Sequence, residues 1–172
     1  MNYLSTLNKS ICALCVSLLL VLGCSTEAEQ NTQTSSESSA STESIAYDSV
    51  QAKKLGADAY GMKPYVMAFL KAGPNRDLDS TEAARLQRAH LDNIFRMADE
   101  GKLVVAGPFM DTGSVRGIYI FNVSTLAEAE ALTATDPAIK AGSLVMELRP
   151  WYGSAALGMI NDLHKKVQKT KI

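Results

Sequence analysis

In the middle of the chain, segments with hydrophobic spacing typical of strands are interspersed with segments whose spacing is typical of helices. Strand-length apolar runs occupy residues 65–70, 103–106, 118–123 and 144–148. Helical periodicity covers residues 80–100 and 125–132. The resulting order β-α-β-β-α-β predicts an α+β, ferredoxin-like fold, with four antiparallel strands and two helices on one face of the sheet.

Capping residues indicate where the helices begin and end. Ser80 is expected to cap the first helix and Gly101 to end it. Thr125 and Glu128 have the spacing of a capping box, which would open the second helix. An added helix is expected at residues 155–169, within a C-terminal segment (residues 154–172) that ends in a basic tail.

The first and third strands are apolar at nearly every position. In a sheet with one face in water, apolar and polar residues would alternate along each strand. Two helices can cover only one face, so the other face needs an apolar cover of its own. Self-association through that face predicts a homodimer in the form of a dimeric α/β barrel. The alternative is that the C-terminal helix folds back over the face with its few apolar residues, Leu157, Met159, Ile160 and Leu163.

Residues 1–23 have the pattern of a bacterial secretory signal peptide. Their apolar run, residues 11–22, is shorter than the roughly 20 residues that a permanent membrane helix needs. The run ends in Val21-Leu22-Gly23-Cys24, which resembles the lipobox that directs a diacylglycerol group onto a cysteine. We therefore expect Cys24 to carry lipid and to anchor the protein in the bacterial cell envelope, at the outer membrane because Ser25 rather than Asp follows it. A plain signal peptide cut nearby and an uncleaved anchor are the alternatives.

Residues 24–59 predict a flexible tether. They are rich in Ser, Thr, Glu and Gln, and such a composition buries too little apolar surface to offset the entropy of ordering the chain. The folded domain is therefore expected at residues 60–153, between this tether and the C-terminal segment.

Composition and charge remove several classes of function. The 172 residues are 47% hydrophobic and 20% charged with a net charge of −1, which lacks the basic footprint of a general nucleic-acid-binding protein. Cys12 and Cys15 imitate a redox C-x-x-C motif but fall inside the signal peptide, so only Cys24 remains after cleavage. With His90 and His164 as the chain's two histidines, we expect no zinc site, and the absence of phosphate-binding and dinucleotide-binding motifs predicts no cofactor.

His90 is the first candidate for chemistry. At 100° per residue it falls on the apolar stripe of the first helix, together with Leu86, Ile94 and Met97. A histidine in this position is either a satisfied core residue or a general base. If it is a base, the site gives up stability to keep it, and His90→Leu is expected to hold or raise the melting temperature.

Asp136 is the second candidate. It precedes Pro137 and is well placed to cap a short helical turn, which by itself would explain it. In a ferredoxin-like topology, however, the loop that carries Asp136 returns near the first helix. A carboxylate beside His90 would fix the tautomer of the imidazole and raise its basicity, as abstraction of a proton requires.

Several short motifs of the domain occur together in one known family. They are residues 65–70, His90-Leu91, Gly101-Lys102-Leu103, Gly107-Pro108-Phe109, Gly117-Ile118-Tyr119, Asp136-Pro137, Gly142 and Pro150-Trp151. With these motifs the chain resembles the YCII-related proteins, which implies a dimeric ferredoxin-like barrel with an active site built around a His–Asp pair, here His90 and Asp136. Ala138 stands where the family usually has Phe, which implies a more open pocket or a different ligand.

Three classes of function remain. The first is a small enzyme without cofactor, a lyase or isomerase that acts on a cyclic or enolisable metabolite through the His90–Asp136 pair. The second is a module that binds a small molecule in the same pocket without turnover, and the third is a structural envelope lipoprotein. A polar pair among apolar residues weakens the third class, so we rank the enzyme first, narrowly above the binding module.

Overall fold

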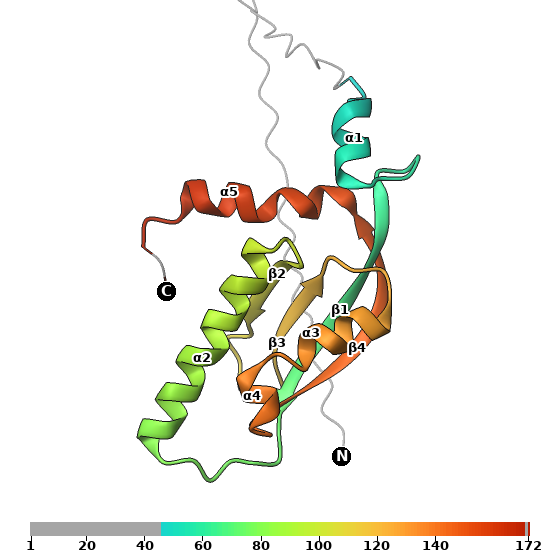
Figure 1. Cartoon of the computed structure of the whole chain (residues 1–172). Helices are drawn as coiled ribbons and strands as arrows, with labels where there is room; N and C mark the ends of the chain where they lie inside the picture. Colours follow the sequence, from blue (N-terminus) through green and yellow to red (C-terminus); the bar gives the residue numbers. More distant parts are fainter. Residues whose placement is uncertain (1–45, 171) are drawn as a thin grey trace, which may run out of the picture. The chain divides into compact units, whose positions relative to one another are not determined.

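The computed structural model describes residues 46–170 and 172 (Figure 1). In chain order, the elements are α1 (Ser49–Leu55), β1 (Met62–Ala72), α2 (Ser80–Asp99), β2 (Leu103–Pro108), β3 (Val115–Phe121), α3 (Leu126–Thr133), α4 (Pro137–Lys140), β4 (Leu144–Ser154), the 3-10 helix η1 (Ala155–Met159) and α5 (Ile160–Val167). The predicted signal peptide, Cys24 and most of the predicted tether lie outside the described residues.

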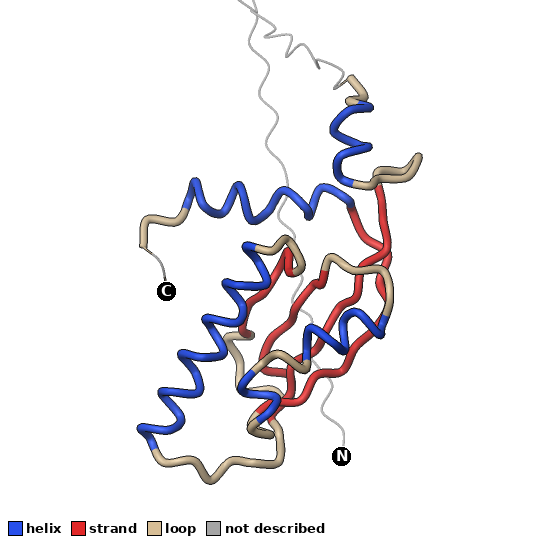
Figure 2. Tube along the Cα trace, in the orientation of Figure 1, coloured by secondary structure: helices blue, strands red, loops and turns tan. Residues whose placement is uncertain are grey.

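The strands form one antiparallel sheet in the order β2-β3-β1-β4, with the helices between them in sequence (Figure 2). This is the predicted βαββαβ arrangement, so the ferredoxin-like α+β fold is confirmed. β4 extends beyond the predicted residues 144–148 because it pairs with β1 along its whole length, from Met62 opposite Ser154 to Ala72 opposite Leu144.

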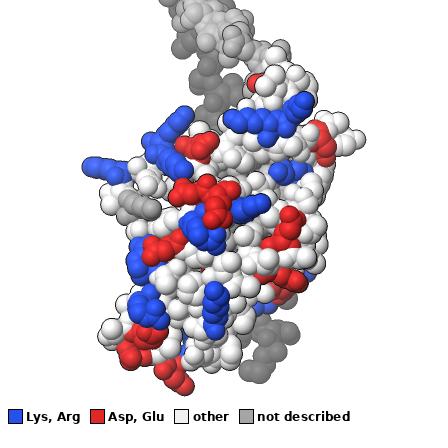
Figure 3. Space-filling model, in the orientation of Figure 1, with Lys and Arg blue, Asp and Glu red and all other residues white. Residues whose placement is uncertain are grey.

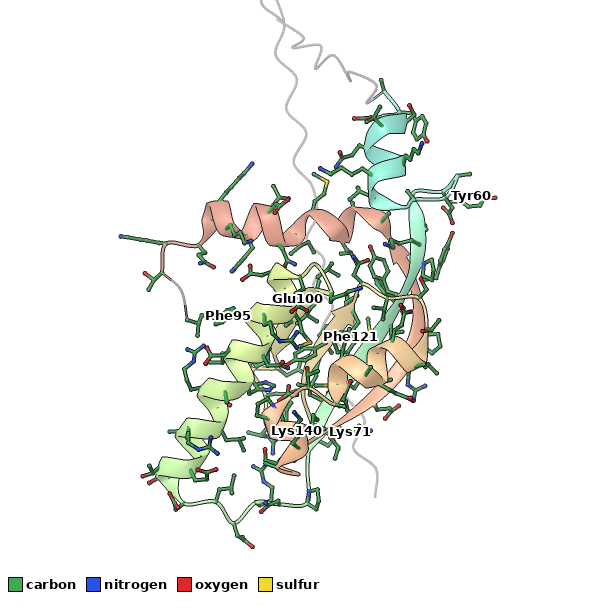
Figure 4. All side chains as sticks on the ribbon, in the orientation of Figure 1. Tyr60, Lys71, Phe95, Glu100, Phe121 and Lys140 are labelled. Carbon is green, nitrogen blue, oxygen red and sulfur yellow. The ribbon has the colours of Figure 1, made fainter. Side chains whose placement is uncertain are left out.

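The main core lies between the sheet and helices α2, α3 and α4, which cover one face of it (Figure 1). Alternate residues of β1, Val66, Ala68 and Leu70, point into this core. Phe121 of β3 is fully buried there, and Figure 4 shows it in the interior of the molecule. Met97 of α2 completes the contact from the helix side.

The opposite face of the sheet carries a second, smaller core. Tyr65, Val104 and Ile120 are buried in it, and Leu157 of η1 packs against them. The C-terminal segment therefore covers one end of this face. The alternative in which this segment folds back over the face is thus present in part. Toward the far end of β1, Phe69 remains only half buried.

The ends of two helices differ from those predicted. Asp79 rather than Ser80 caps α2, because its carboxylate accepts hydrogen bonds from the backbone N–H groups of Thr81 and Glu82. The C-terminal helix starts as the 3-10 turn η1 and ends earlier than residue 169. Gly158 belongs to this turn, where an added Cβ would lie 3.1 Å from Leu55, so the glycine lets α1 approach η1.

The tether predicted for residues 24–59 is too long at its C-terminal end, because α1 lies inside that range. Asp48 accepts hydrogen bonds from two N–H groups of the first turn, and Gly56 ends the helix with a positive φ of 70°. A helix this short is unstable alone, so it depends on tertiary contact. Its Gln51 amide lies 3.3 Å from the sulfur of Met159 in η1.

The surface carries charges of both signs. Lys and Arg side chains lie among Asp and Glu side chains over the face shown in Figure 3. The turn before β1 projects Tyr60 into solvent, as Figure 4 shows. Within residues 46–170, none of the helices has the length and apolarity needed to cross a membrane.

Candidate active site

His90 lies on the buried face of α2, as the helical spacing predicted. Its exposed fraction is 7%, and Leu86 and Met97 are buried on the same face. The stripe differs in one member, because Asn93 is buried whereas Ile94 is only half buried. The long helix thus holds an imidazole between helix and sheet, where charge is poorly solvated.

Asp136 lies in the loop between α3 and α4, and both of its predicted contacts are present, the cap of the following helix and the contact with His90. It caps α4, since its Oδ1 accepts a hydrogen bond of 2.8 Å from the N–H of Ala138. It also contacts His90, whose Nδ1 is 2.8 Å from Oδ2 and 3.0 Å from Oδ1. The carboxylate is fully buried. Two residues 46 positions apart in sequence are therefore in direct contact inside the protein.

The hydrogen bonds define which nitrogen of His90 is free to act as a base. A carboxylate can only accept, so we assign the proton of the neutral ring to Nδ1, which donates to Asp136. Nε2 then carries the lone pair. It lies 3.3 Å from the hydroxyl of Tyr119, which donates to it.

Tyr119 is the functional candidate that the sequence analysis missed. It belongs to β3, is 2% exposed, and its ring stacks on that of His90 with 6.3 Å between centroids. Burial, followed by the negative charge of Asp136, raises the pKa of Tyr119 well above its ordinary value. The phenol therefore stays protonated and serves as a donor. Tyr119 lies on the side of its strand that faces the helices. The one signal in the sequence is that a residue with a hydroxyl group occupies a position expected to be buried, where the hydroxyl needs a hydrogen-bond partner.

A second polar group holds the loop that carries Asp136. The guanidinium of Arg96 donates to the Oδ1 of Asn93 at 2.9 Å and to the hydroxyl of Thr135 at 3.0 Å. Thr135 directly precedes Asp136, so α2 holds this loop through Thr135 as well as through the contact between His90 and Asp136. The Nδ2 of Asn93 is buried without a hydrogen-bond partner among the described residues.

A pocket of about 300 Å³ lies next to the pair. Its lining comes from the β1–α2 loop, the start of α2, the bulged end of β3 and the segment from α4 to β4: Asn75, Arg76, Leu78, Ala83, Leu86, Gln87, Arg116, Ala138, Ser143 and Leu144. Leu86 is one helical turn before His90, and the N–H of Ala138 bonds to Asp136. Two residues of the pocket wall, Leu86 and the small Ala138, are thus neighbours of the His–Asp pair.

Other groups in the described part of the chain do not form a comparable site. A hollow of about 360 Å³ between α3 and β4 lacks any neighbour of His90. His164 is exposed on α5. Among the described residues, no three His, Cys, Asp or Glu side chains are grouped so as to hold a metal ion.

Comparison with known families shows the family to which this chain belongs. A family model for the YCII-related domain matches residues 65–152, a range that contains His90, Tyr119 and Asp136. The chain belongs to the YCII-related family. No curated protein sequence matches it.

One solved structure to which this YCII-related chain is similar is 5-chloro-2-hydroxyhydroquinone dehydrochlorinase from Burkholderia phenoliruptrix AC1100, in complex with 2,5-dihydroxybenzoquinone. The two are 18% identical, with a TM-score of 0.39. The match covers 50% of this chain and 92% of the dehydrochlorinase.

Proposed function

We propose that this YCII-related domain is a small enzyme that needs no cofactor and performs lyase or isomerase chemistry on a cyclic or enolisable metabolite. His90 is the general base and Asp136 is its positioning residue. The observation that carries this proposal is the buried chain of hydrogen bonds from Asp136 through His90 to Tyr119, beside a pocket of about 300 Å³. Pockets of this size accept small metabolites.

The chemistry follows from the assigned tautomer. With its proton on Nδ1 held by Asp136, His90 accepts a substrate C–H proton on Nε2, and the electron pair of that C–H bond moves toward an adjacent carbonyl to form an enolate. In an isomerase, the imidazolium returns the proton to a different carbon. In a lyase, the electron pair instead forms a C=C bond, and a leaving group departs with its own bonding pair.

Tyr119 contributes a donor that does not ionise. Because its pKa is raised, the hydroxyl can give a hydrogen bond to the lone pair of Nε2 in the free protein and to a developing oxyanion once substrate is bound. Asp136 stabilises the imidazolium that forms, through the 2.8 Å contact to Nδ1.

Burial of these groups favours function over a purely structural role. A fully buried carboxylate and a nearly buried imidazole lose hydration that apolar side chains of similar size would not lose. Sites that give up stability in this way are typically kept for their chemistry.

A binding module without turnover is the second candidate, because Leu86 and Ala138, rather than His90 itself, line the pocket. One experiment separates the two. The purified protein is incubated with a bacterial metabolite extract, and retained and altered small molecules are followed by mass spectrometry. An enzyme alters a compound over time, whereas a binding module only retains it.

Asp136→Asn is the matched control for this experiment. Asparagine caps a helix nearly as well as aspartate, so α4 is kept. Its amide presents a donor to Nδ1, which drives the ring proton to Nε2 and removes the base. Turnover should fall by about 10²–10⁴-fold. A compound that this variant alters at the wild-type rate would contradict the proposed role of the pair.

We further propose that the protein is a lipoprotein of the bacterial cell envelope, held at the outer membrane by lipid on Cys24. The support is the apolar run that ends in Gly23-Cys24. A tether between Cys24 and α1 would reach roughly 25 Å, by the scaling of flexible chains. It would hold the domain clear of the lipid headgroups.

We also propose a homodimer, formed through the sheet face that the C-terminal segment leaves uncovered. Met67 and Phe69 of β1 and Ile118 of β3 lie on this face and are only half buried. Two copies packed face to face would remove these side chains from water.

A further inference from the structure

We propose that the pocket beside His90 takes an organic carboxylate, which Arg76 and Arg116 hold by its negative group. The inference rests on the proposed function, because it assigns a substrate class to the pocket of the His90–Asp136 pair. It goes beyond that function in naming the residues that would recognise the substrate, neither of which is part of the pair.

The arginines of the chain divide into two groups. Four of the six are paired with carboxylates: Arg85 with Glu82, Arg88 with Asp92, Arg96 with Glu100 and Arg149 with Glu147. The other two, Arg76 and Arg116, have no carboxylate partner among the described residues. Both line the same pocket, and its lining contains no acidic side chain. An uncompensated pair of cations in one concave site attracts an anion.

A β-bulge directs Arg116 into the pocket. Leu70 of β1 pairs with Gly117, but the next residue, Lys71, pairs with Val115, so Arg116 is an extra residue on β3 that has no partner on β1. A bulge of this kind re-aims a side chain. Gly117 keeps the strands close at this point, because an added Cβ would lie 2.5 Å from the backbone oxygen of Gly107.

Backbone contacts hold Arg76 in place on the other wall. The β1–α2 loop is bonded to the turn before β4, through Asn75 N–H to Gly142 oxygen at 3.0 Å and through the Arg76 guanidinium to Ser143 oxygen at 3.2 Å. Asp79 of this loop caps α2 and does not line the pocket. Asp77 is exposed and does not line the pocket.

The remaining lining fits the carbon body of such a ligand. Leu78, Leu86 and Leu144 give apolar walls, and Gln87 adds one amide. A guanidinium presents parallel N–H donors that match the two oxygens of a carboxylate. Positive charge at the pocket would also stabilise the negative charge that develops on an enolate. An enolisable carboxylate therefore suits both the arginines and the base.

The test compares benzoate with benzamide, a neutral molecule of the same shape. Binding to the full-length protein is followed by ligand-observed NMR titration, with inorganic phosphate as a separate probe. We expect benzoate to bind and benzamide not to bind. Arg116→Gln and Arg76→Gln should each weaken benzoate binding by about tenfold or more, as loss of a charge-assisted hydrogen bond implies. Arg85→Gln removes the same charge outside the pocket and should change nothing.

Several results would overturn the inference. One is that benzamide binds as tightly as benzoate, and another is that inorganic phosphate binds while benzoate does not. A third is that Arg76→Gln and Arg116→Gln both bind benzoate as the wild type does, with melting temperatures equal to that of the wild type. Failure of the enzyme proposal is distinguishable. If benzoate binding depends on the arginines but no compound is turned over, the carboxylate site is supported and the enzyme proposal fails. If the protein turns over an uncharged substrate and needs Asp136 to do so, the enzyme proposal is supported and the carboxylate site is contradicted.

Discussion

At the scale of single residues, His90 and Asp136 are more tightly coupled than their sequence positions indicate. Asp136 is fully buried, and besides His90 its carboxylate contacts the N–H of Ala138. The expectation that His90→Leu holds or raises the melting temperature therefore needs revision. Leucine would remove the imidazole donor and leave the buried carboxylate with the N–H of Ala138 as its remaining donor among the described residues, which costs about 1–3 kcal/mol.

Replacement of His90 by asparagine separates stability from chemistry. The side-chain amide of the introduced asparagine can still donate to Asp136 in place of Nδ1–H, but nothing replaces Nε2 as a base. We expect His90→Asn to retain most of the free energy of unfolding that His90→Leu loses, while neither variant turns over substrate. Denaturant titration of the wild type and both variants measures this. Equal stability of the asparagine and leucine variants would show that the carboxylate contact contributes little.

Tyr119 predicts a pH effect on stability. The pKa of Tyr119 is raised in the folded protein. Its contribution to the free energy of unfolding is therefore fully present below the ordinary tyrosine pKa of about 10. Above that pH the contribution is lost progressively, because Tyr119 ionises only in the unfolded chain.

The slope is measurable from unfolding curves above pH ~10, the ordinary tyrosine pKa. One such group lowers the free energy of unfolding by up to about 1.4 kcal/mol per pH unit. Tyr119→Phe should remove that part of the slope, whereas Tyr60→Phe, at an exposed side chain, should leave it unchanged. An unchanged slope in the Tyr119 variant would mean that its hydroxyl reaches water.

At the scale of elements, the β2–β3 hairpin is built around a close approach of two glycines. Gly117 lies against Gly107, and a methyl group at Gly117 would meet backbone atoms, whereas an added Cβ at Gly107 meets nothing within 4 Å. Gly117→Ala should therefore lower stability by about 1–3 kcal/mol, as overpacking does. It should also displace Arg116 and weaken benzoate binding.

Gly107→Ala provides the matched control for this prediction. It adds the same methyl group to the same hairpin, in open space. Thermal unfolding and benzoate titration of both variants decide the matter. Equal behaviour of the two alanine variants would contradict the role assigned to the bulge.

At the scale of the whole molecule, the uncovered sheet face predicts association. The chain without residues 1–45 should sediment as a dimer at micromolar concentration, because burial of Phe69 and its neighbours removes apolar surface from water. Phe69→Lys should give a monomer. Leu126→Lys, on the helix-covered side, should remain a dimer. A wild-type monomer under these conditions would contradict the proposed interface.

The envelope location is tested separately at Cys24. Cys24→Ala removes the thiol that would accept diacylglycerol, so labelling with a fatty acid should be lost and the precursor should accumulate. The wild-type chain, expressed in the same bacterial cells, is the reference. Labelling that persists in the alanine variant would exclude lipidation at this residue.

Much of the fold was predictable because its signals are local. Alternating and helical spacings indicated the order of strands and helices, and the capping box of Thr125 and Glu128 is present as predicted. Helical spacing also placed His90 on a buried face. Local signals were weaker for α1, whose seven residues are stable only in contact with η1.

What the sequence by itself determined is the chain of elements and the side of α2 on which His90 lies, since both depend on residues close together along the chain. Only the tertiary structure decided which groups meet. The hydroxyl of Tyr119 reaches Nε2 of His90 because β3 packs beneath α2, and Arg116, at a bulge in that same strand, lines the same pocket as Arg76. Contacts between distant residues depend on register and packing, which no local pattern encodes.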